Sequence, residues 1–297
     1  MKILVLGSNG FIGRNCIDFF KDEELSGADI NECKNSGIKF YKLNNDNPDY
    51  NSIFEKDNFD VCINASGTGS VQFSFLDLSA DYTQNVSNVF KILEAIRKNN
   101  SSCRFINFSS AAVYGNPTVL PIKEDAKLSP MSPYGFHKYM SEQLCEEFYK
   151  IYNIRSISLR IFSVYGIYQK KLLFWDLYEK IKSSNSIKMF GSGNETRDYI
   201  YIKDLMKAIY IIIKKAKFES QAINIANGVE TNINDISQEF CSIVRKSNIE
   251  IKFNNILQEG YPSNWQADIS LLKKLGYTPD YNLNKGLTEY IDWLKKI

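Results

Sequence analysis

A glycine-rich turn close to the N-terminus limits the folds open to this chain more than any other feature. Gly7, Gly10 and Gly13 recur at every third position, after the apolar run of residues 3–6 and at the start of a helical pattern over 12–23. This spacing allows a tight turn, close approach of the backbone to an anion, and tight packing of helix on strand. A glycine turn without a ligand is the alternative, but the position after a first strand favours a dinucleotide pyrophosphate at the helix N-terminus.

Alternating strand and helix patterns follow this turn. Short apolar runs at 60–65, 104–109 and 154–161 predict strands, and helical spacing at 79–98 and 134–152 predicts the helices between them. Such alternation implies crossover units, and hence a mostly parallel sheet with helices on both faces. We therefore expect an α/β fold, with a Rossmann doubly wound parallel sheet.

After residue 165 the pattern becomes less regular and indicates a smaller α/β C-terminal domain. We expect a segment of about 190–227 to return to the first domain. The predicted helices are 171–183, 203–217, 234–246 and 284–296, and the predicted short strands are 187–190, 222–225 and 250–253.

The composition argues against several classes of protein. With 36 basic and 34 acidic residues the formal net charge is +2, which gives no electrostatic reason to expect nucleic acid or an acidic membrane as partner. One histidine and six cysteines without a CxxC pair argue against a zinc site, and we expect no metal. We find no secretory signal and no apolar run near the ~20 residues of a membrane span. A cytoplasmic protein with reduced thiols is expected.

Asp29 is the candidate for binding the ribose hydroxyls of the dinucleotide. It follows Gly13 by 16 residues, slightly short of the ~20 expected for the acidic residue that ends the second strand. A solvated turn residue is the alternative, because the second strand is poorly marked. No arginine follows closely to hold a 2′-phosphate, so the sequence favours NAD over NADP.

A serine, a tyrosine and a lysine further along the chain indicate redox chemistry. Ser109 and Ser110 follow a predicted strand, and Tyr134 and Lys138 share one helix face at a spacing of four. A nearby ammonium and a cationic cofactor should lower the pKa of the phenol, which then serves as a base. Alone, this spacing is a common accident among 18 tyrosines, but it follows both earlier motifs. His137 inside the motif is interpreted as a surface or packing residue rather than a catalyst.

Five motifs together resemble those of the extended short-chain dehydrogenase/reductase family, in particular UDP-glucose 4-epimerase-like enzymes (NAD-dependent epimerase/dehydratase). They are the glycine loop, Ser-Ser-Ala-Ala-Val-Tyr-Gly at 109–115, the tyrosine–lysine pair, and the segments 160–166 and 190–204. The resemblance covers nearly the whole chain. It implies an NAD-binding Rossmann domain at 1–165 and a mainly substrate-binding domain at 166–297. It also implies action on a sugar carried by a nucleoside diphosphate.

The resemblance assigns roles to individual residues. The catalytic residues are expected to be Ser110, Tyr134 and Lys138. The expected cofactor contacts are Gly7, Asn9, Gly10, Phe11, Ile12, Gly13, Asp29, Asn44, Ala65, Ser66, Gly67, Asn85, Ser109, Tyr134, Lys138 and Phe162. The expected substrate contacts are Ser70, Ser110, Ala111, Ser163, Lys171, Leu172, Arg197 and Gln258.

Arg197 matches an arginine that holds a substrate phosphate in the family. Its planar guanidinium suits phosphate oxygens. An internal ion pair with Asp198 or Asp204 is the alternative for this side chain.

Two departures from the family pattern leave the sugar and the base undecided. Ser163 replaces an asparagine that contacts the substrate, and Gln258 replaces an arginine directed at the pyrophosphate. Lys170 and Lys171 could supply the missing charge, or could be solvated helix residues.

Ala111 and Ala112 narrow the reaction. Family members that dehydrate a hexose have Asp-Glu at these positions to move protons, and those that epimerise at C3 and C5 use a Cys-His pair. The preferred interpretation is a 4-epimerase, which oxidises C4, rotates the keto-sugar and returns the hydride to the other face. A nucleotide-sugar dehydrogenase or 4-ketoreductase using NAD(P) stays open, as does a non-catalytic dinucleotide-binding protein.

A homodimer is also expected from the resemblance. It would pack the helices near 79–98 and 134–152 against their mates. Burial in the core of one chain explains the same apolar faces.

Overall fold

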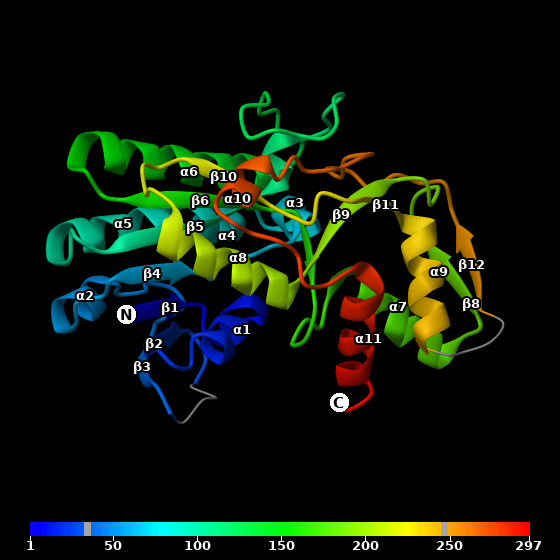
Figure 1. Ribbon diagram of the computed structural model, residues 1–297, viewed down its shortest axis with the longest axis horizontal. Coiled ribbons are helices and arrows are strands. Elements are labelled where there is room, and N and C mark those ends of the chain that lie inside the picture. The colour runs from blue at the N-terminus through cyan, green and yellow to red at the C-terminus, as the bar shows by residue number, and fades with distance from the viewer. Residues whose placement is uncertain (33–36, 245–248) are drawn as a thin grey trace.

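A seven-stranded parallel sheet organises the larger part of the molecule, seen in Figure 1. The computed structural model describes residues 1–32, 37–244 and 249–297. The strands lie in the order β10-β6-β5-β4-β1-β2-β3, and every neighbouring pair is parallel. Their bounds are β1 Lys2–Leu6, β2 Glu24–Asp29, β3 Lys39–Lys42, β4 Val61–Asn64, β5 Arg104–Ser110, β6 Ser156–Ile161 and β10 Ala222–Ile225. The strand order reverses between β1 and β4, where doubly wound folds bind their ligands.

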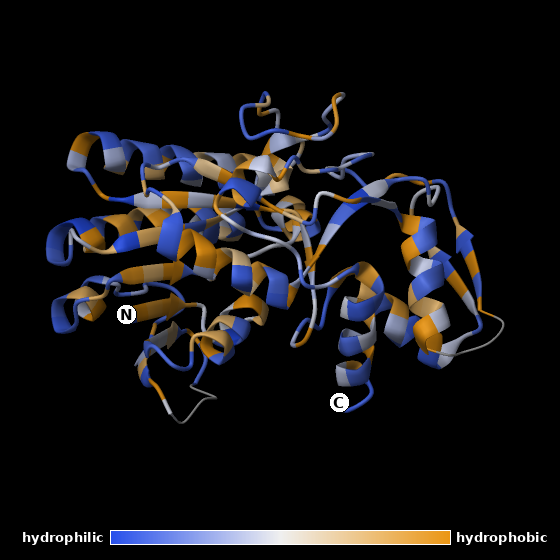
Figure 2. Cartoon of the chain, viewed as in Figure 1, coloured by the Kyte–Doolittle hydropathy of each residue, from blue (hydrophilic) through white to orange (hydrophobic). Residues whose placement is uncertain are grey.

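Helices cover both faces of this sheet, as the doubly wound fold requires. Strand β1 shows why, because Ile3 and Val5 belong to one apolar cluster while Leu4 and Leu6 belong to the other. Alternate side chains of a strand point to opposite faces, so a strand buried on both sides is apolar throughout. Figure 2 shows these apolar strands between amphipathic helices. One layer holds α2 Asn51–Lys56, α5 Asn88–Asn99 and α6 Pro133–Tyr152, and the other holds α1 Phe11–Phe19 and α8 Ile202–Lys215.

The later part of the chain adds two small sheets and four helices. A three-stranded sheet joins β11 Glu230–Asn232, β9 Thr196–Tyr201 and β7 Ser163–Tyr165, and a second pairs β8 Ser186–Met189 with β12 Glu250–Phe253. From β9 the chain passes through α8 into β10, at the edge of the large sheet beside β6. The domain boundary at 165 stays a prediction. The helices are α7 Leu172–Ser183, α9 Ile233–Val244, α10 Ser270–Lys274 and α11 Leu283–Leu294.

Two predicted helices differ from those in the structure. The helix predicted at 12–23 ends at Phe19, before the polar run that leads into β2. The helix predicted at 79–98 is α4 Leu78–Tyr82, a π-helical turn over Thr83–Ser87, and then α5. A further helix, α3 Val71–Leu76, was not predicted. The last two residues of the helix predicted at 234–246 lie outside the described residues.

The cysteines are placed as thiols in the core. Cys16, Cys62, Cys103, Cys145 and Cys241 are free and buried, and the sixth, Cys33, lies outside the described residues. Burial raises the pKa of the Cys103 and Cys145 thiols to about 12, so these groups stay protonated near neutral pH. Within the described ranges, no helix is long and apolar enough to cross a membrane. No group of His, Cys, Asp and Glu there could hold a metal ion.

Candidate active site

The glycine loop has the geometry that its spacing predicts. Gly7 has φ +75°, a conformation that favours glycine. A β-carbon on Gly13 would lie 2.0 Å from the carbonyl oxygen of Gly7, so only glycine allows helix and strand to approach this closely. Helix α1 begins at Phe11 with Gly10 as its N-cap. Its first N–H groups therefore face the cavity without a capping side chain and can bind an anion.

Asp29 ends strand β2, as predicted, and is buried. Its carboxylate accepts a hydrogen bond of 2.9 Å from the Asn9 N–H of the glycine loop and one of 2.9 Å from the Asn31 N–H. The alternative of a solvated turn residue is therefore excluded. A third bond comes from the Asn31 amide, and a carboxylate accepts about four, so capacity remains for a ribose hydroxyl.

Asn44 lies two residues after the end of β3, and its side chain hydrogen-bonds within its own loop. Its amide oxygen accepts hydrogen bonds from the N–H groups of Asp46, at 2.8 Å, and Asn47, at 3.1 Å. It lines a separate cavity of about 420 Å³ rather than the main one. A contact of Asn44 with the adenine stays a prediction.

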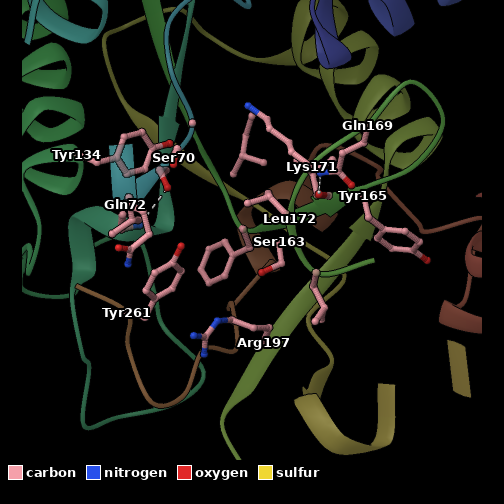
Figure 3. A pocket seen from close by; sticks show the side chains of 18 of the residues that line it. Ser70, Gln72, Tyr134, Ser163, Tyr165, Gln169, Lys171, Leu172, Arg197 and Tyr261 are labelled. Carbon is pink, nitrogen blue, oxygen red and sulfur yellow. Dashed lines mark hydrogen bonds between the residues drawn. The ribbon is translucent and has the colours of Figure 1, made fainter. Parts of the chain in front are cut away.

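The main cavity, of about 700 Å³, extends from the N-terminus of α1 to the small sheets. Figure 3 shows how side chains from both parts of the chain surround it. Ten of the expected cofactor contacts line it: Gly10, Phe11, Ile12, Ala65, Ser66, Gly67, Ser109, Tyr134, Lys138 and Phe162. Expected cofactor contacts that do not line it are Gly7, Asn9, Gly13, Asp29, Asn44 and Asn85.

Most of the expected substrate contacts also lie on this wall. They are Ser70, Ser110, Ser163, Lys171, Leu172, Arg197 and Gln258. Ala111, the first residue of the 3₁₀ turn that follows β5, is fully buried in the apolar core, whereas its neighbour Ala112 lines the cavity. A contact of Ala111 with the substrate stays a prediction.

The expected catalytic residues converge where β5 and α6 meet. Helix α6 starts at Pro133, and its N-cap Ser132 accepts a hydrogen bond from Gly135 N–H at 3.1 Å. This start places Tyr134 and Lys138 in the first turns, beside the end of β5. The Lys138 ammonium donates to the carbonyl oxygen of Phe108 at 2.8 Å and lies 5.7 Å from the centre of the Tyr134 ring.

The ionisation of this pair is set first by burial. Burial raises the pKa of Tyr134 to about 12, a hydrogen bond with Ser110 lowers this pKa, and the charge of Asp81 raises it. Burial lowers the pKa of Lys138 to about 8, while Asp81 raises this pKa. The expectation of a lowered phenol pKa includes the positive charge of the bound cofactor and stays a prediction.

Arg197, on β9, extends into the cavity and forms no ion pair with any residue that the structure describes. Its guanidinium donates to the backbone oxygens of Thr196, at 2.7 Å, and Ser263, at 3.2 Å, and lies 5.4 Å from the Trp265 ring. Asp198 accepts hydrogen bonds from backbone N–H groups instead, including that of Ala267 at 3.0 Å. Asp204 likewise accepts from the backbone of residues 280 and 281. The internal-pair alternative is excluded, and the cation is available to a ligand.

Lys170 and Lys171 point in different directions. The Lys170 ammonium lies 5.8 Å from the Trp175 ring and 6.0 Å from the Trp293 ring, outside the cavity. Lys171 lines the cavity, and burial lowers the pKa of its ammonium. Among the residues that the structure describes, Lys171 has no carboxylate partner. The chain thus places two unpaired cations, Lys171 and Arg197, on the same wall.

Several lining residues were missed by the sequence reasoning. They are Gln72, close in sequence to the expected contact Ser70, and Tyr261 and Trp265, which follow the expected contact Gln258. The Gln72 amide donates to the carbonyl oxygen of Glu259 at 3.4 Å, so the two segments meet across the cavity. Phe190 and Leu257, both exposed, add apolar surface farther from Tyr134 along the wall.

The doubly wound sheet, the glycine loop and the serine–tyrosine–lysine set facing one cavity define an NAD-dependent enzyme of the extended short-chain dehydrogenase/reductase type. The sequence model of the NAD dependent epimerase/dehydratase family matches residues 3–226, and the chain belongs to this family.

Curated relatives and solved structures resemble the chain over its whole length. An uncharacterized UDP-glucose epimerase of Bacillus subtilis is 30% identical, over 100% of this chain and 99% of its own. A UDP-glucuronate 4-epimerase of Thermodesulfobacterium geofontis is 26% identical, over 99% and 96%. The crystal structure of the UDP-glucuronic acid 4-epimerase of Bacillus cereus, in complex with UDP-glucuronic acid and NAD, has a TM-score of 0.90 and 28% identity, covering 100% of this chain and 99% of that one.

Proposed function

We propose that this protein is an NAD-dependent 4-epimerase of a UDP-linked hexose. The observation that carries the proposal is the convergence of Ser110, Tyr134 and Lys138 on a cavity where the two residues after Ser110 are alanines. The 4-epimerases among the relatives support the position of attack on the sugar, and their UDP-sugars support the nucleotide.

The chain supplies the proton transfers of this reaction. Ser110 and Tyr134 hold the oxygen on C4 of the sugar, and Tyr134 takes its proton as the carbon becomes a ketone. NAD bound along the glycine loop would supply the hydride acceptor for C4 and a positive charge that favours the tyrosinate. Lys138 stabilises the same tyrosinate. Once the keto-sugar has turned and presents its other face to the cofactor site, Tyr134 gives the proton back to the C4 oxygen.

A dehydratase is disfavoured by the structure of the turn after β5. Ala111 is buried and Ala112 faces the cavity, so neither position offers a carboxyl to move protons at C5 and C6. The cavity of about 700 Å³ is within the usual range of ~300–1,000 Å³ for ligand sites.

The diphosphate is assigned to Arg197 and Lys171. Both are cations on the cavity wall, and a diphosphate is the part of the substrate that needs two of them. Lys171 thereby supplies the charge that is missing at Gln258. The apolar surface of Phe190 and Leu257 suits the flat base beyond the diphosphate.

We also propose a homodimer that acts in the cytoplasm. Exposed apolar side chains gather on α4, α5 and α6, which pack against one another: Tyr82, Phe90, Phe136 and Met140. Large exposed apolar patches commonly mark interfaces, and paired helices of a second copy would cover this one. The five described thiols are free, which suits a reducing compartment.

A panel of nucleotide sugars tests the proposed function. The protein as purified is incubated with UDP-glucose, UDP-galactose, UDP-glucuronic acid and their GDP, CDP and dTDP counterparts, and epimers are resolved by NMR. We expect retained NAD and conversion of one pair of UDP-linked C4 epimers without net change in nicotinamide absorbance. Stoichiometric formation or consumption of NADH would instead establish a dehydrogenase or ketoreductase. Bound NAD without any turnover would establish a binding protein.

A further inference from the structure

A buried, hydrogen-bonded histidine–aspartate pair lies beside the proposed catalytic residues of α6. The Nδ1 atom of His137, on α6, lies 2.5 Å from a carboxylate oxygen of Asp81, on α4. Asp81 is 0% exposed and His137 6% exposed, so both groups are removed from water. His137 is the single histidine of the chain and directly precedes Lys138. Neither side chain takes part in the proposed proton transfers, although burying a carboxylate is costly unless it is hydrogen-bonded.

The pair fixes the orientation of a third side chain, Asn85, in the π-helical turn between α4 and α5. The Asn85 amide nitrogen donates to the second carboxylate oxygen of Asp81 at 3.1 Å. Because a carboxylate only accepts, the amide cannot be reversed, and its oxygen must point away from Asp81. That oxygen is buried and has no hydrogen-bond partner. It faces the cofactor loop, where a β-carbon on Gly67 would lie 2.9 Å from it.

The same carboxylate acts on the proposed catalytic pair through its charge. Burial makes the ammonium of Lys138 less favourable, and Asp81 is the charged group that raises the pKa of Lys138 against this effect. Two further titratable groups lie on the surrounding elements. Tyr82 meets His137 edge to face, with ring centres 5.4 Å apart, and Glu142, one turn beyond Lys138, is paired with Arg160.

We propose that the Asp81–His137 pair is a positioning element of the active site: it orients the Asn85 amide toward the cofactor loop and holds a buried carboxylate against the helix that carries Tyr134 and Lys138. His137 holds Asp81 in place from α6, and Asp81 joins α4 and the π-helical turn to the helix that carries Tyr134 and Lys138. The inference rests on the proposed function, because the ammonium matters only where Tyr134 acts as base.

The test is the pH dependence of kcat/KM for epimerisation in three variants of the full-length protein with bound NAD. Asp81→Asn removes the charge and keeps the size of the side chain. The double variant D81N/H137Q replaces the hydrogen-bonded pair by two amides that can still hydrogen-bond, which preserves folding if the single variant does not. His137→Gln is the matched control, because it retains the carboxylate and an N–H donor.

We expect the alkaline limb of the profile to move to lower pH by about one unit in both variants that lack the charge. The sign follows because loss of Asp81 lowers the pKa of Lys138, so the ammonium is lost at a lower pH. We expect kcat to fall with little change in KM, and the alkaline limb to stay in place in His137→Gln.

Two results would overturn the inference. One is an alkaline limb that stays in place when the charge is removed, even if kcat or Tm falls. The other is an equal shift in His137→Gln, since the carboxylate is then not the cause. The wild-type protein distinguishes failure of the proposed function from failure of this inference. If the wild type epimerises no UDP-hexose, the proposed function is wrong; if it does, the variants test the Asp81–His137 pair.

Discussion

The cavity has two walls that are built in different ways. The wall at the carboxyl edge of the large sheet is made of short motifs, in which local backbone geometry places the functional groups. These motifs are the glycine loop, the strand end at Ser110 and the first turns of α6. The wall toward the small sheets gathers side chains from segments far apart, such as Lys171, Arg197 and Gln258. Substitutions on the first wall should therefore abolish chemistry or cofactor binding, whereas those on the second should change substrate affinity.

The largest effect is expected at Tyr134, on the first wall. Tyr134→Phe removes the acid–base hydroxyl and should lower kcat/KM by about 10²–10⁴-fold, the usual contribution of a general acid–base group. The steady-state rate of epimerisation measures it. Bound NAD should be retained, because the ring and its packing are unchanged. An unimpaired rate would show that another group moves the proton.

Gly13 tests the first wall through its backbone contact with Gly7. Gly13→Ala would place a β-carbon 2.0 Å from the Gly7 oxygen, so we expect loss of retained NAD and a free energy of unfolding lower by about 1–3 kcal/mol. Denaturant unfolding and absorbance of the released cofactor measure the two effects. Gly37→Ala is the matched control, since nothing lies within 4 Å of a β-carbon there. Equal behaviour of both variants would contradict the assigned role of the loop.

The second wall is tested at its cations. Arg197→Lys keeps the charge but removes the planar fork, and should raise KM for the nucleotide sugar by about 10-fold, which corresponds to one charge-assisted hydrogen bond. Lys171→Ala should act in the same direction. NAD retention should not change in either variant. Lys170→Ala is the control, since that side chain lies against tryptophan rings outside the cavity. A KM change in the control equal to that in Lys171→Ala would refute the assignment of the two lysines.

A smaller effect is expected on stability, at Lys138. Its pKa is about 8 in the fold, below the 10.5 of a free lysine, so unfolding takes up a proton between these values. Stability from this group therefore rises as pH increases from about 8 to 10.5. Lys138→Met should raise Tm at neutral pH, and the gain should shrink across that window. A gain that is constant with pH would show that the buried ammonium is not its cause.

The sequence predicted the first wall better than the second because local patterns determine it. Apolar runs located β1, β5 and β10, and the glycine spacing placed the turn before α1. Strand β3, Lys-Phe-Tyr-Lys, was missed because it is a half-exposed strand at the edge of the sheet. The π-helical turn at 83–87 was read as ordinary helix, because an extra residue in one turn barely disturbs the apolar periodicity.

On the second wall, distant contacts decide which side chain faces the ligand. The sequence could not separate Lys170 from Lys171. The Lys170 ammonium lies near the Trp293 ring, which is distant in sequence. Lys171 is followed by Leu172, whose left-handed backbone, with φ +68°, helps to set the direction of the chain there. His137 was expected to be a surface or packing residue, and it is buried. Its hydrogen-bond partner Asp81 lies on another helix, so no local sequence pattern indicates the contact. Ala111 and Ala112 were not distinguished either, since the 3₁₀ turn decides which of them meets the cavity.

The most direct test of the account follows the hydrogen on C4. The wild-type protein with its retained NAD is given a UDP-hexose deuterated at C4, and the epimer that forms is analysed by NMR. The account predicts that the product keeps the deuterium at C4 and that no reduced cofactor accumulates, because one hydride leaves and returns within the same site. Loss of the deuterium to solvent, or its accumulation in reduced nicotinamide, would contradict the account.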